Sequence, residues 1–490
     1  MGRHGTYQGT LLNMKNKFYI TTTLPYVNAD PHIGFAAEIL RADVLARFAR
    51  LEGKEVFFNT GTDEHGLKIH RKAIEQKKDP QVYVDEYAKK FDELKKALNL
   101  SYNNFIRTTD KNHKKSAQEF WKKCNASGDI YKKNYKVNYC VGCELELTES
   151  ELVDGKCPHH PNQEIEYIEE ENYFFRWSKY ADKLLDFYER NPDFIVPKHR
   201  MNEIKRFIEA GLQDFSISRL KSKMPWGVPV PGDGEHVMYV WFDALTNYIN
   251  CLNWVEDDKM FHDFWPGMQV AGKDNLRQQT AMWQAMLMSA GLPNSKQILI
   301  FGFINSNGQK MSKSLGNVVN QYDLIKKYGI DATRYYLLSG LKPFEDSDFT
   351  YDKFEEKYNA DLANGLGNLV ARVSNMLEKN KIEIDIKIGS DDDLKKRVKE
   401  KLDKYLFDEA LKVLWDELRK DDEFLSQKTP WKLKDVKEIK EVLEPVAQSI
   451  LNAADLLSVF LPDVAEKIIT QFNQNQVKKG EPLFPRLTKE

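Results

Sequence analysis

The chain has 490 residues, of which 41% are hydrophobic and 30% are charged, and its formal net charge is −2 at pH 7. These values are typical of a folded globular chain with room for two or three domains, and they exclude a disordered or fibrous protein. No apolar run approaches the roughly 20 residues that span a bilayer, and the first residues lack the apolar core of a signal peptide. We therefore expect a cytoplasmic protein without a membrane partner.

The first sixty residues predict a short extension followed by a β-α-β unit. Residues 1–13 carry no periodic pattern, and we expect a flexible, dispensable segment there. Residues 18–23 are strand-like, turn-forming residues follow them, and apolar residues then recur at helical spacing up to Leu51. A second strand-like run, 56–59, completes the unit, whose ligand edge lies at the strand ends.

His32 and Gly34 stand where the helix of this unit is expected to begin. A helix N-terminus offers free backbone N–H groups and the positive end of the helix dipole, and glycine lets a nucleotide approach the backbone closely. The pattern therefore predicts a phosphate site, with His32 as a hydrogen-bond donor. A lone histidine at a helix start is more often only a cap, and that interpretation stays open at this point.

Three of the five cysteines, Cys140, Cys143 and Cys157, fall together and are followed by His160. Two Cys-x2 knuckles with four soft or borderline ligands match the spacing that tetrahedral zinc prefers. A disulfide is the competing interpretation, but it would leave the third cysteine and the histidine unexplained. With four protein ligands no position remains for an activated water, so we expect one structural zinc ion per chain.

A polar loop after the apolar run 298–304 contains Lys310 and Lys313 in the sequence Lys-Met-Ser-Lys-Ser. Two lysines three positions apart, preceded by Gly308, suit a polyphosphate, because both ammonium groups can stabilise a leaving pyrophosphate. A solvated lysine and serine loop is the simpler interpretation of the composition alone.

Taken together, the phrases His-Ile-Gly-Phe at 32–35 and Lys-Met-Ser-Lys-Ser at 310–314 resemble the paired signatures of class I aminoacyl-tRNA synthetases. The phrases at 24–28, 62–66, 239–244 and 272–274 are similar to those of the methionyl-tRNA synthetase family in particular. The resemblance runs from about Lys17 to the C-terminus. It implies an α/β fold: a Rossmann-like class I synthetase catalytic domain, interrupted by a zinc-bearing connective insertion and followed by an all-α helical-bundle anticodon-binding domain.

The resemblance also implies domain boundaries. These are 1–13 for the extension, 14–125 for the first half of the catalytic domain, 126–224 for the insertion with the zinc knuckle, 225–353 for the second half with the lysine loop and a stem-contact region, and 354–490 for the helical domain. The insertion is too short for the large editing domains of the leucine, isoleucine and valine enzymes. The chain ends soon after residue 485, without the appended domain that makes some members dimers, so we expect a monomer.

The resemblance favours His160 over His159 as the fourth metal ligand. It also assigns residues to two substrate sites. For L-methionine they are Leu24, Tyr26, Asp63, Trp241, Ala244, Tyr248 and Gln279, with Asp63 binding the amino group and the aromatic rings facing the thioether. For ATP with Mg²⁺ they are His32, Gly34, Glu38, Gly272, Asp274, Lys310 and Lys313, of which His32 and the two lysines are expected to be catalytic. The product is methionyl-adenylate, which then charges tRNA(Met), including the initiator tRNA.

Within the helical domain, Asn368, Arg372 and Trp431 resemble the family's anticodon-reading positions. A tryptophan and an arginine can stack on unpaired bases, and an asparagine can read a base edge. Asn368 and Arg372 are four residues apart, which places them on one face of a helix.

The sequence departs from the family pattern at several positions near the active site, among them Phe301, which stands where histidine is frequent. Phe35 stands where the first signature usually has a second histidine, and Gln278 and Gln279 replace an aromatic residue followed by histidine. These departures motivate an alternative, a catalytically weak tRNA-binding paralogue. The intact Lys310 and Lys313 argue against it.

Overall fold

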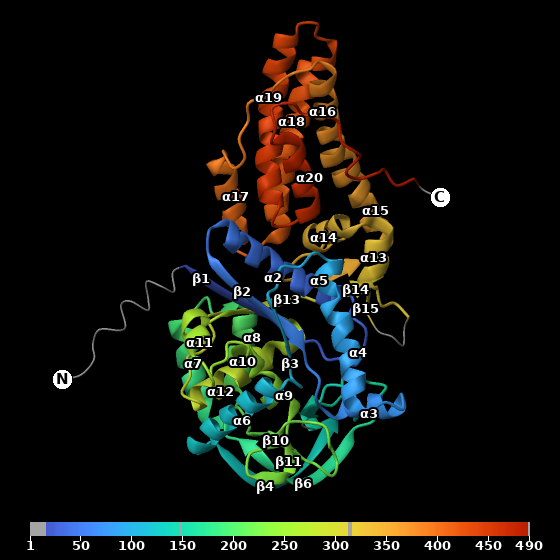
Figure 1. Cartoon of the computed structure of the whole chain (residues 1–490). Helices are drawn as coiled ribbons and strands as arrows, with labels where there is room; N and C mark the ends of the chain where they lie inside the picture. The colour runs from blue at the N-terminus through green and yellow to red at the C-terminus, as the bar shows by residue number, and fades with distance from the viewer. Residues whose placement is uncertain (1–15, 148, 312–315, 489–490) are drawn as a thin grey trace, which may run out of the picture. The chain divides into compact units, whose positions relative to one another are not determined.

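The computed structural model describes residues 16–147, 149–311 and 316–488 (Figure 1). The chain folds into two compact units. One unit comprises residues 1–30, 53–93 and 102–301, and the other comprises residues 31–52, 94–101 and 302–490. The extension expected over residues 1–13 lies outside the described residues.

The first unit contains a six-stranded parallel sheet in the order β3-β2-β1-β12-β13-β7. The strands are β1 (Lys17–Thr22), β2 (Glu55–Thr62), β3 (Asn104–Arg107), β7 (Ile195–Val196), β12 (Met268–Gly272) and β13 (Gln297–Phe301). Seven consecutive residues of β2 are buried, as expected of a parallel strand covered on both faces. This parallel arrangement confirms the α/β class.

Strand β2 is longer than the sequence predicted, because residues 60–62 continue it beyond Asn59. Gly61 explains the difference. A Cβ at Gly61 would lie 1.8 Å from the carbonyl oxygen of Ile106 on β3, so only glycine lets the two strands approach this closely. Glycine has a low intrinsic preference for strands, but here the close approach of β3 requires it.

The helices of the first unit surround a core rich in aromatic side chains. They are α3 (Leu67–Glu75), α4 (Pro80–Asp92), α6 (Lys111–Ala126), α7 (Ala181–Arg190), α8 (Lys198–Glu209), α9 (Val240–Ala244), α10 (Asn247–Asn250), α11 (Lys259–Phe264), a π-helical turn (Gln278–Met282) and α12 (Trp283–Ser289). Phe120 of α6 packs against Phe242 of α9 and Trp283 of α12, with ring centroids 5.9 and 5.5 Å away. This packing holds the short α9, which carries several predicted site residues.

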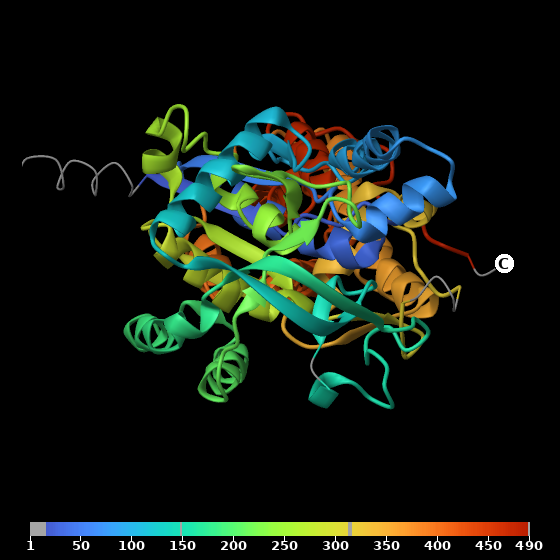
Figure 2. The same ribbon diagram turned by 90° about the horizontal axis from the view of Figure 1, so that it is seen from below.

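Two small antiparallel sheets come from the stretch of chain between β3 and β12, which also contains β7 of the parallel sheet. The strands are β4 (Ile130–Cys140), β5 (Leu145–Leu147), β6 (Glu166–Phe175), β8 (Phe215–Ser216), β9 (Ser218–Leu220), β10 (Pro229–Val230) and β11 (Asp233–Met238). They pair in the orders β5-β4-β6-β8 and β10-β11-β9. Figure 2 shows β4 and β6 as a long paired ribbon, and the predicted metal ligands begin at the last residue of β4.

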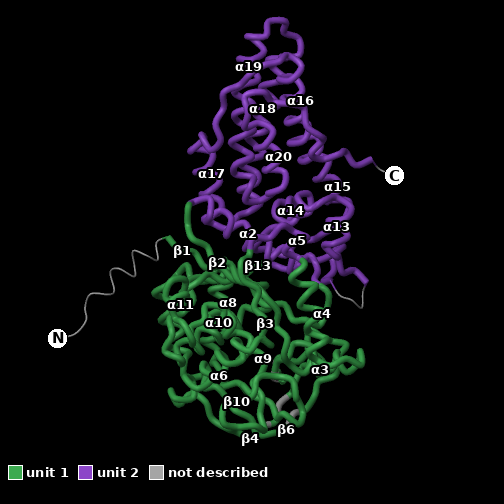
Figure 3. The backbone as a smooth tube through the Cα atoms, in the orientation of Figure 1, with its two compact units in different colours: residues 1–30, 53–93, 102–301 green, residues 31–52, 94–101, 302–490 purple. Residues whose placement is uncertain are grey.

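The second unit is mainly helical (purple in Figure 3). Its helices are α2 (Ile33–Leu51), α5 (Leu94–Ala97), α13 (Gln321–Tyr328), α14 (Ile330–Ser339), α15 (Tyr351–Lys357), a π-helical segment (Tyr358–Gly367), α16 (Asn368–Lys379), α17 (Asp392–Leu402), α18 (Phe407–Lys428), α19 (Val436–Leu457) and α20 (Pro462–Phe472). The short strands β14 (Ile304–Ser306), β15 (Gln309–Lys310) and β16 (Ser347–Phe349) form a three-stranded sheet.

Helix α19 packs against both α18 and α20, which confirms the helical C-terminal region. Each of these helices turns a stripe of aliphatic side chains inward, for example Leu411, Leu414 and Leu418 on α18. Among the described residues, no helix combines the length and the hydropathy that crossing a bilayer requires.

Candidate active site and metal centre

The turn at the start of α2 forms as the sequence predicts, and His32 caps it. The Nδ1 atom of His32 accepts a hydrogen bond from the backbone N–H of Gly34 at 3.0 Å. A Cβ at Gly34 would lie 2.7 Å from Cε1 of His32, so the glycine lets the imidazole fold over the helix start. The same Cβ position lies 3.9 Å from the methyl carbon of Met311, so the residue after Lys310 lies next to this turn. His32 is therefore a cap as well as a predicted phosphate ligand.

The remaining predicted phosphate contacts of the second unit differ in burial. Lys310 is exposed at the end of β15, and its ammonium lies 5.1 Å from the ring centroid of Phe303. Glu38 is buried in α2, with 8% of the residue exposed. Lys313 lies outside the described residues.

In the first unit, the turn after β1 and the end of β2 lie side by side and carry the predicted amino-acid ligands. Tyr26 and Asp63 form an isolated parallel bridge, and Asp63 donates its backbone N–H to the carbonyl of Pro25 at 3.0 Å. Leu24 is half-buried in the same turn. Sequence alone placed Asp63 at a strand end, and the structure adds that Tyr26 is its direct neighbour.

The carboxylate of Asp63 is buried beside other acidic side chains. Only 6% of the residue is exposed, and its Oδ1 atom has no hydrogen-bond partner among the described residues. Burial, followed by the nearby charges of Asp243 and Glu144, raises the pKa of Asp63 well above its ordinary value. A ligand ammonium at this position would supply a countercharge.

The predicted wall of the amino-acid site is aromatic. Tyr26 and Trp241 pack against one small cluster of buried residues, Tyr139, Tyr239 and Val240. The indole N–H of Trp241 is also buried without a hydrogen-bond partner among the residues that the structure places. Ala244, three positions further along α9, is buried as well. The structure thus places Tyr26, Asp63 and Trp241 in one region of the first unit.

Gln279 has its hydrogen-bonding needs met inside the protein. Its amide nitrogen donates to the hydroxyl of Tyr248 at 2.5 Å, and its amide oxygen accepts from Gln269 at 3.3 Å. Gln269 in turn accepts a hydrogen bond from the hydroxyl of Ser295 at 2.6 Å. Because both ends of the Gln279 amide are bonded, this glutamine does not present an unsatisfied polar group to an apolar ligand.

The predicted adenosine loop follows β12 directly. Asp274 folds back over Gly272, since a Cβ at that glycine would lie 2.7 Å from Oδ1 of Asp274. Asn275 donates to the same oxygen at 3.3 Å. Any larger residue at position 272 would displace the carboxylate that we expect to bind the ribose.

The structure also contains a buried cluster of two histidines and an aspartate that sequence reasoning missed. His65 Nδ1 lies 2.6 Å from Oδ2 of Asp243, and His113 Nε2 lies 2.7 Å from Oδ1 of the same carboxylate. Burial by itself raises the pKa of Asp243, but the two imidazoles outweigh it and hold that pKa well below its ordinary value. This cluster ties the end of β2 to α6 and α9. Nothing in the spacing of residues 178 positions apart could have indicated it.

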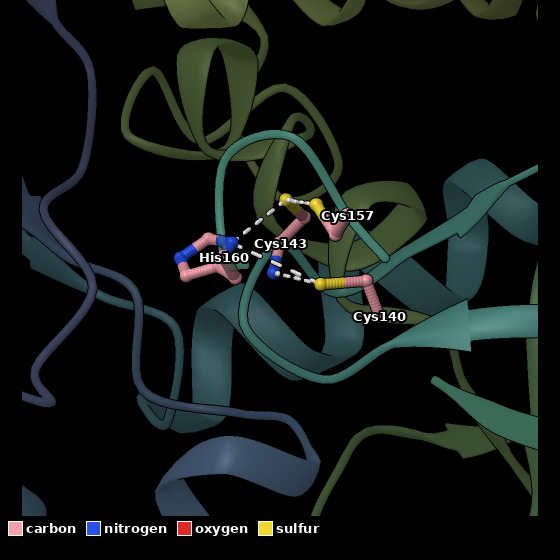
Figure 4. Close-up of side chains that lie close together, drawn as sticks. All are labelled: Cys140, Cys143, Cys157 and His160. Atoms are coloured by element: carbon pink, nitrogen blue, oxygen red, sulfur yellow. Dashed lines mark hydrogen bonds between the residues drawn. The ribbon is translucent and has the colours of Figure 1, made fainter. Parts of the chain in front are cut away.

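The four predicted metal ligands converge, as Figure 4 shows. Their ligand atoms all lie within 4.8 Å of one another, and the Cys143 sulfur lies 3.1 Å from Nδ1 of His160 and 3.5 Å from the Cys157 sulfur. The hydrogen bond between Cys140 and Cys143 lowers the pKa of the Cys140 thiol and raises the pKa of the Cys143 thiol, so the two sulfurs favour one thiolate and one thiol. A Cβ at Gly142 would lie 2.4 Å from the His160 ring, so glycine is required there. This cluster could hold a metal ion.

The predicted anticodon residues lie on the second unit. Asn368 is exposed at the first position of α16, and Trp431 is 50% exposed. The guanidinium of Arg372 lies 5.3 Å from the ring centroid of Trp431 and forms an ion pair with Asp422. The structure therefore brings Arg372 and Trp431 together, and it adds Asp422, which sequence analysis missed.

Comparison with known proteins agrees with this arrangement. The family described as "tRNA synthetases class I (M)" matches residues 18–167 and 160–374 of the chain. The methionine–tRNA ligase of Clostridium acetobutylicum is 42% identical to the chain, with 97% of this chain and 79% of that protein aligned. The chain belongs to the methionyl-tRNA synthetase family.

Other members of the methionyl-tRNA synthetase family align as completely. The methionine–tRNA ligase of a Nostoc species is 41% identical over 94% of this chain and 91% of its own length. A structure of Mycobacterium tuberculosis methionyl-tRNA synthetase in complex with methionyl-adenylate superposes with a TM-score of 0.91 at 35% identity, covering 96% of this chain and all of that one. The apo form of the Mycobacterium enzyme gives a TM-score of 0.84.

Proposed function

We propose that the chain is a methionine–tRNA ligase, which activates L-methionine with ATP and transfers it to tRNA(Met). The observation that carries the proposal is the match along almost the whole chain to methionine–tRNA ligases, at 42% identity in one case. The buried Asp63 beside Tyr26 and Trp241 supports it, because these groups suit the ammonium and the thioether of methionine. The weak paralogue is the alternative that the first experiment below tests.

In the proposed reaction no protein side chain acts as a nucleophile. The carboxylate of methionine attacks the α-phosphorus of ATP, the bond to pyrophosphate breaks, and methionyl-adenylate forms. A ribose hydroxyl of the 3′-terminal adenosine of tRNA then attacks the adenylate carbonyl and releases AMP. Asp63 holds the ammonium, while His32, Lys310 and Lys313 bind phosphate oxygens and offset their charge. Alignment and electrostatic stabilisation supply the rate enhancement.

The remaining residue roles and boundaries follow the family pattern. Gly34, Glu38, Gly272 and Asp274 bind ATP with Mg²⁺, Leu24, Ala244, Tyr248 and Gln279 complete the methionine site, and Asn368, Arg372 and Trp431 read the anticodon. The insertion spans residues 126–224, between catalytic segments 14–125 and 225–353, and the anticodon domain spans 354–490. The enzyme acts in the cytoplasm as a monomer, and its tRNA substrates include the initiator.

The metal in the proposal is one structural zinc ion held by Cys140, Cys143, Cys157 and His160. Three thiolates and an imidazole whose ligand atoms lie within 4.8 Å of one another suit tetrahedral zinc. Zinc bound there would fix the two knuckles and would take no part in adenylate formation.

Pyrophosphate exchange into ATP, measured with each amino acid in turn and without tRNA, tests the proposed activity. We expect exchange with methionine only. Lys313→Ala is expected to lower the rate about 100-fold or more, because one charge-stabilising contact to the transition state is lost. Lys326→Ala, at an exposed lysine of α13, is the matched control and should leave the rate unchanged. Retained tRNA binding without any exchange would favour the weak paralogue instead.

Trp431→Ala is expected to impair charging of tRNA while leaving methionine activation intact. Loss of one base stack is worth about 1 to 3 kcal/mol, so KM for tRNA should rise roughly 5-fold to 150-fold. Steady-state aminoacylation measures this change, and pyrophosphate exchange measured in parallel should not move. Tyr351→Ala removes another exposed aromatic side chain of the second unit, 45% exposed, and serves as the control. An unchanged KM for tRNA in Trp431→Ala would remove this residue from the anticodon site.

A further inference from the structure

Glu144 directly follows the metal-cluster residue Cys143, and it combines two costly features. Its φ is +52°, in the left-handed region where non-glycine residues are uncommon. Only 4% of the residue is exposed, so its carboxylate is removed from water. Backbone strain and burial of a charge both cost free energy, and they persist only where surrounding contacts offset them.

Those contacts join several separate segments of the first unit. Oε1 of Glu144 accepts hydrogen bonds from the hydroxyl of Tyr26 at 2.8 Å and from the backbone N–H of Lys68 at 2.7 Å. Oε2 accepts one from the hydroxyl of Tyr139 at 3.0 Å, and the Glu144 carbonyl oxygen accepts one from Tyr239. One residue thus connects the metal knuckle with the turn after β1, the first turn of α3 and the residue before α9.

A glycine, Gly66, leaves the space that the Glu144 carboxylate and the Tyr26 hydroxyl occupy. Gly66 has a φ of +110°, and a Cβ there would lie 2.2 Å from the Tyr26 hydroxyl oxygen and 3.0 Å from Oε1 of Glu144. Lys68 provides a second tie, because its ammonium donates to the carbonyl of Gly142 at 2.9 Å. The knuckle is therefore bonded to the start of α3 through both Gly142 and Glu144.

Tyr26, whose hydroxyl donates a hydrogen bond to Glu144, belongs to the predicted amino-acid site. Tyr26 bridges to Asp63, and it shares a packing cluster with Trp241 and with Val141 of the knuckle. We propose that Glu144 is a positioning residue, which orients Tyr26 and the adjoining Asp63 turn for methionine from a fixed point beside the metal centre. This inference rests on the proposed function, because methionine is the ligand whose binding Glu144 supports.

Calorimetric titration of the zinc-loaded, full-length chain with L-methionine tests the inference. Glu144→Ala is expected to raise Kd about 10-fold to 100-fold, as loss of a supporting contact typically does. Glu144→Gln keeps an oxygen for Tyr26 and Lys68 and an amide that can donate to Tyr139, so it should restore Kd to within about fourfold. Glu164→Ala, at an exposed glutamate of the same insertion, is the control and should match wild type.

A double-mutant cycle shows whether Glu144 acts through Tyr26. Tyr26→Phe should raise Kd, and adding Glu144→Ala to it should raise Kd little further, because both changes break one contact. If Glu144→Ala does not fold, Tyr26→Phe decides the matter, since it removes only the donated hydroxyl. The inference would be overturned by an unchanged Kd in either single variant, or by loss of zinc from Glu144→Ala. It would also be overturned if the two changes in binding free energy simply added in the double variant. Failure of wild type to bind methionine would instead overturn the proposed function, and this inference with it.

Discussion

Replacing Asp63 with asparagine is expected to lower kcat/KM for methionine about 100-fold to 1000-fold while leaving the fold intact. The carboxylate is buried, and its Oδ1 has no hydrogen-bond partner among the described residues. A substrate ammonium would form a desolvated charge pair with it, and removing one partner of such a pair costs about 2 to 5 kcal/mol. Asparagine has nearly the same shape but no charge. Pyrophosphate exchange at varied methionine concentration measures the loss.

Two further measurements separate this effect from damage to the fold. Thermal unfolding of Asp63→Asn should occur at the same or a higher temperature than in wild type, because a neutral amide replaces a carboxyl group whose ionisation burial disfavours. Asp30→Asn changes an exposed carboxylate near the same turn, paired with Lys90 at 2.6 Å, and should leave kcat/KM unchanged. A wild-type kcat/KM in Asp63→Asn would exclude Asp63 as the ammonium ligand.

The pH dependence of methionine binding follows from the same carboxylate. Burial, then the charges of Asp243 and Glu144, raises the pKa of Asp63 well above its ordinary value. Only the ionised form can neutralise an ammonium, so affinity is full above this pKa and is lost as the pH falls through it. The loss should therefore begin well above about pH 4, the ordinary range of an aspartate. The exchange assay over a range of pH should show it, and Asp63→Asn should remove it.

Replacing Arg334 with methionine is expected to lower the free energy of unfolding by about 3 to 5 kcal/mol, the usual cost of breaking a buried ion pair. Arg334 and Asp43 are both fully buried, and their side chains lie 2.8 Å apart. Arg334 also donates to the carbonyl oxygens of Phe460 and Leu98, each at 2.7 Å. The substitution leaves a buried carboxylate and two carbonyls with fewer partners. The urea midpoint of the helical circular dichroism signal measures the change.

Acid unfolding provides a second readout of this pair. Burial alone raises the pKa of Asp43, but Arg334, Arg47 and Ser101 outweigh it and leave that pKa below its ordinary value. Its stabilising contribution is therefore present above about pH 4 and is lost as the pH falls through the folded-state pKa. Arg334→Met should show a smaller loss over this range. Arg397→Met removes a half-exposed arginine with two carboxylate partners, and as control it should cost about 1 kcal/mol or less.

Sequence reasoning was most successful where the relevant groups are close along the chain. The start of α2 was predicted from turn residues and helical spacing, and His32 indeed caps that helix. The metal cluster spans only residues 140–160, so its spacing alone limits how the four side chains can meet. The first β-α-β unit followed from the period of the apolar residues, which backbone geometry dictates directly. The rest of the catalytic domain and the helical C-terminal region were expected from the family resemblance.

Only the tertiary structure decided which distant groups would meet. Glu144 and Tyr26 are 118 positions apart, His65 and Asp243 are 178 apart, and Asp43 and Arg334 are 291 apart. Hydrophobic periodicity says which face of an element is buried, but not which polar group of another element lies opposite. That choice depends on strand order and on the packing of several elements at once, and each buried charge then needs a partner in whatever space remains. The sequence by itself therefore determined the family, the class of fold and the local signatures, whereas the fold determined the partners of the buried charges.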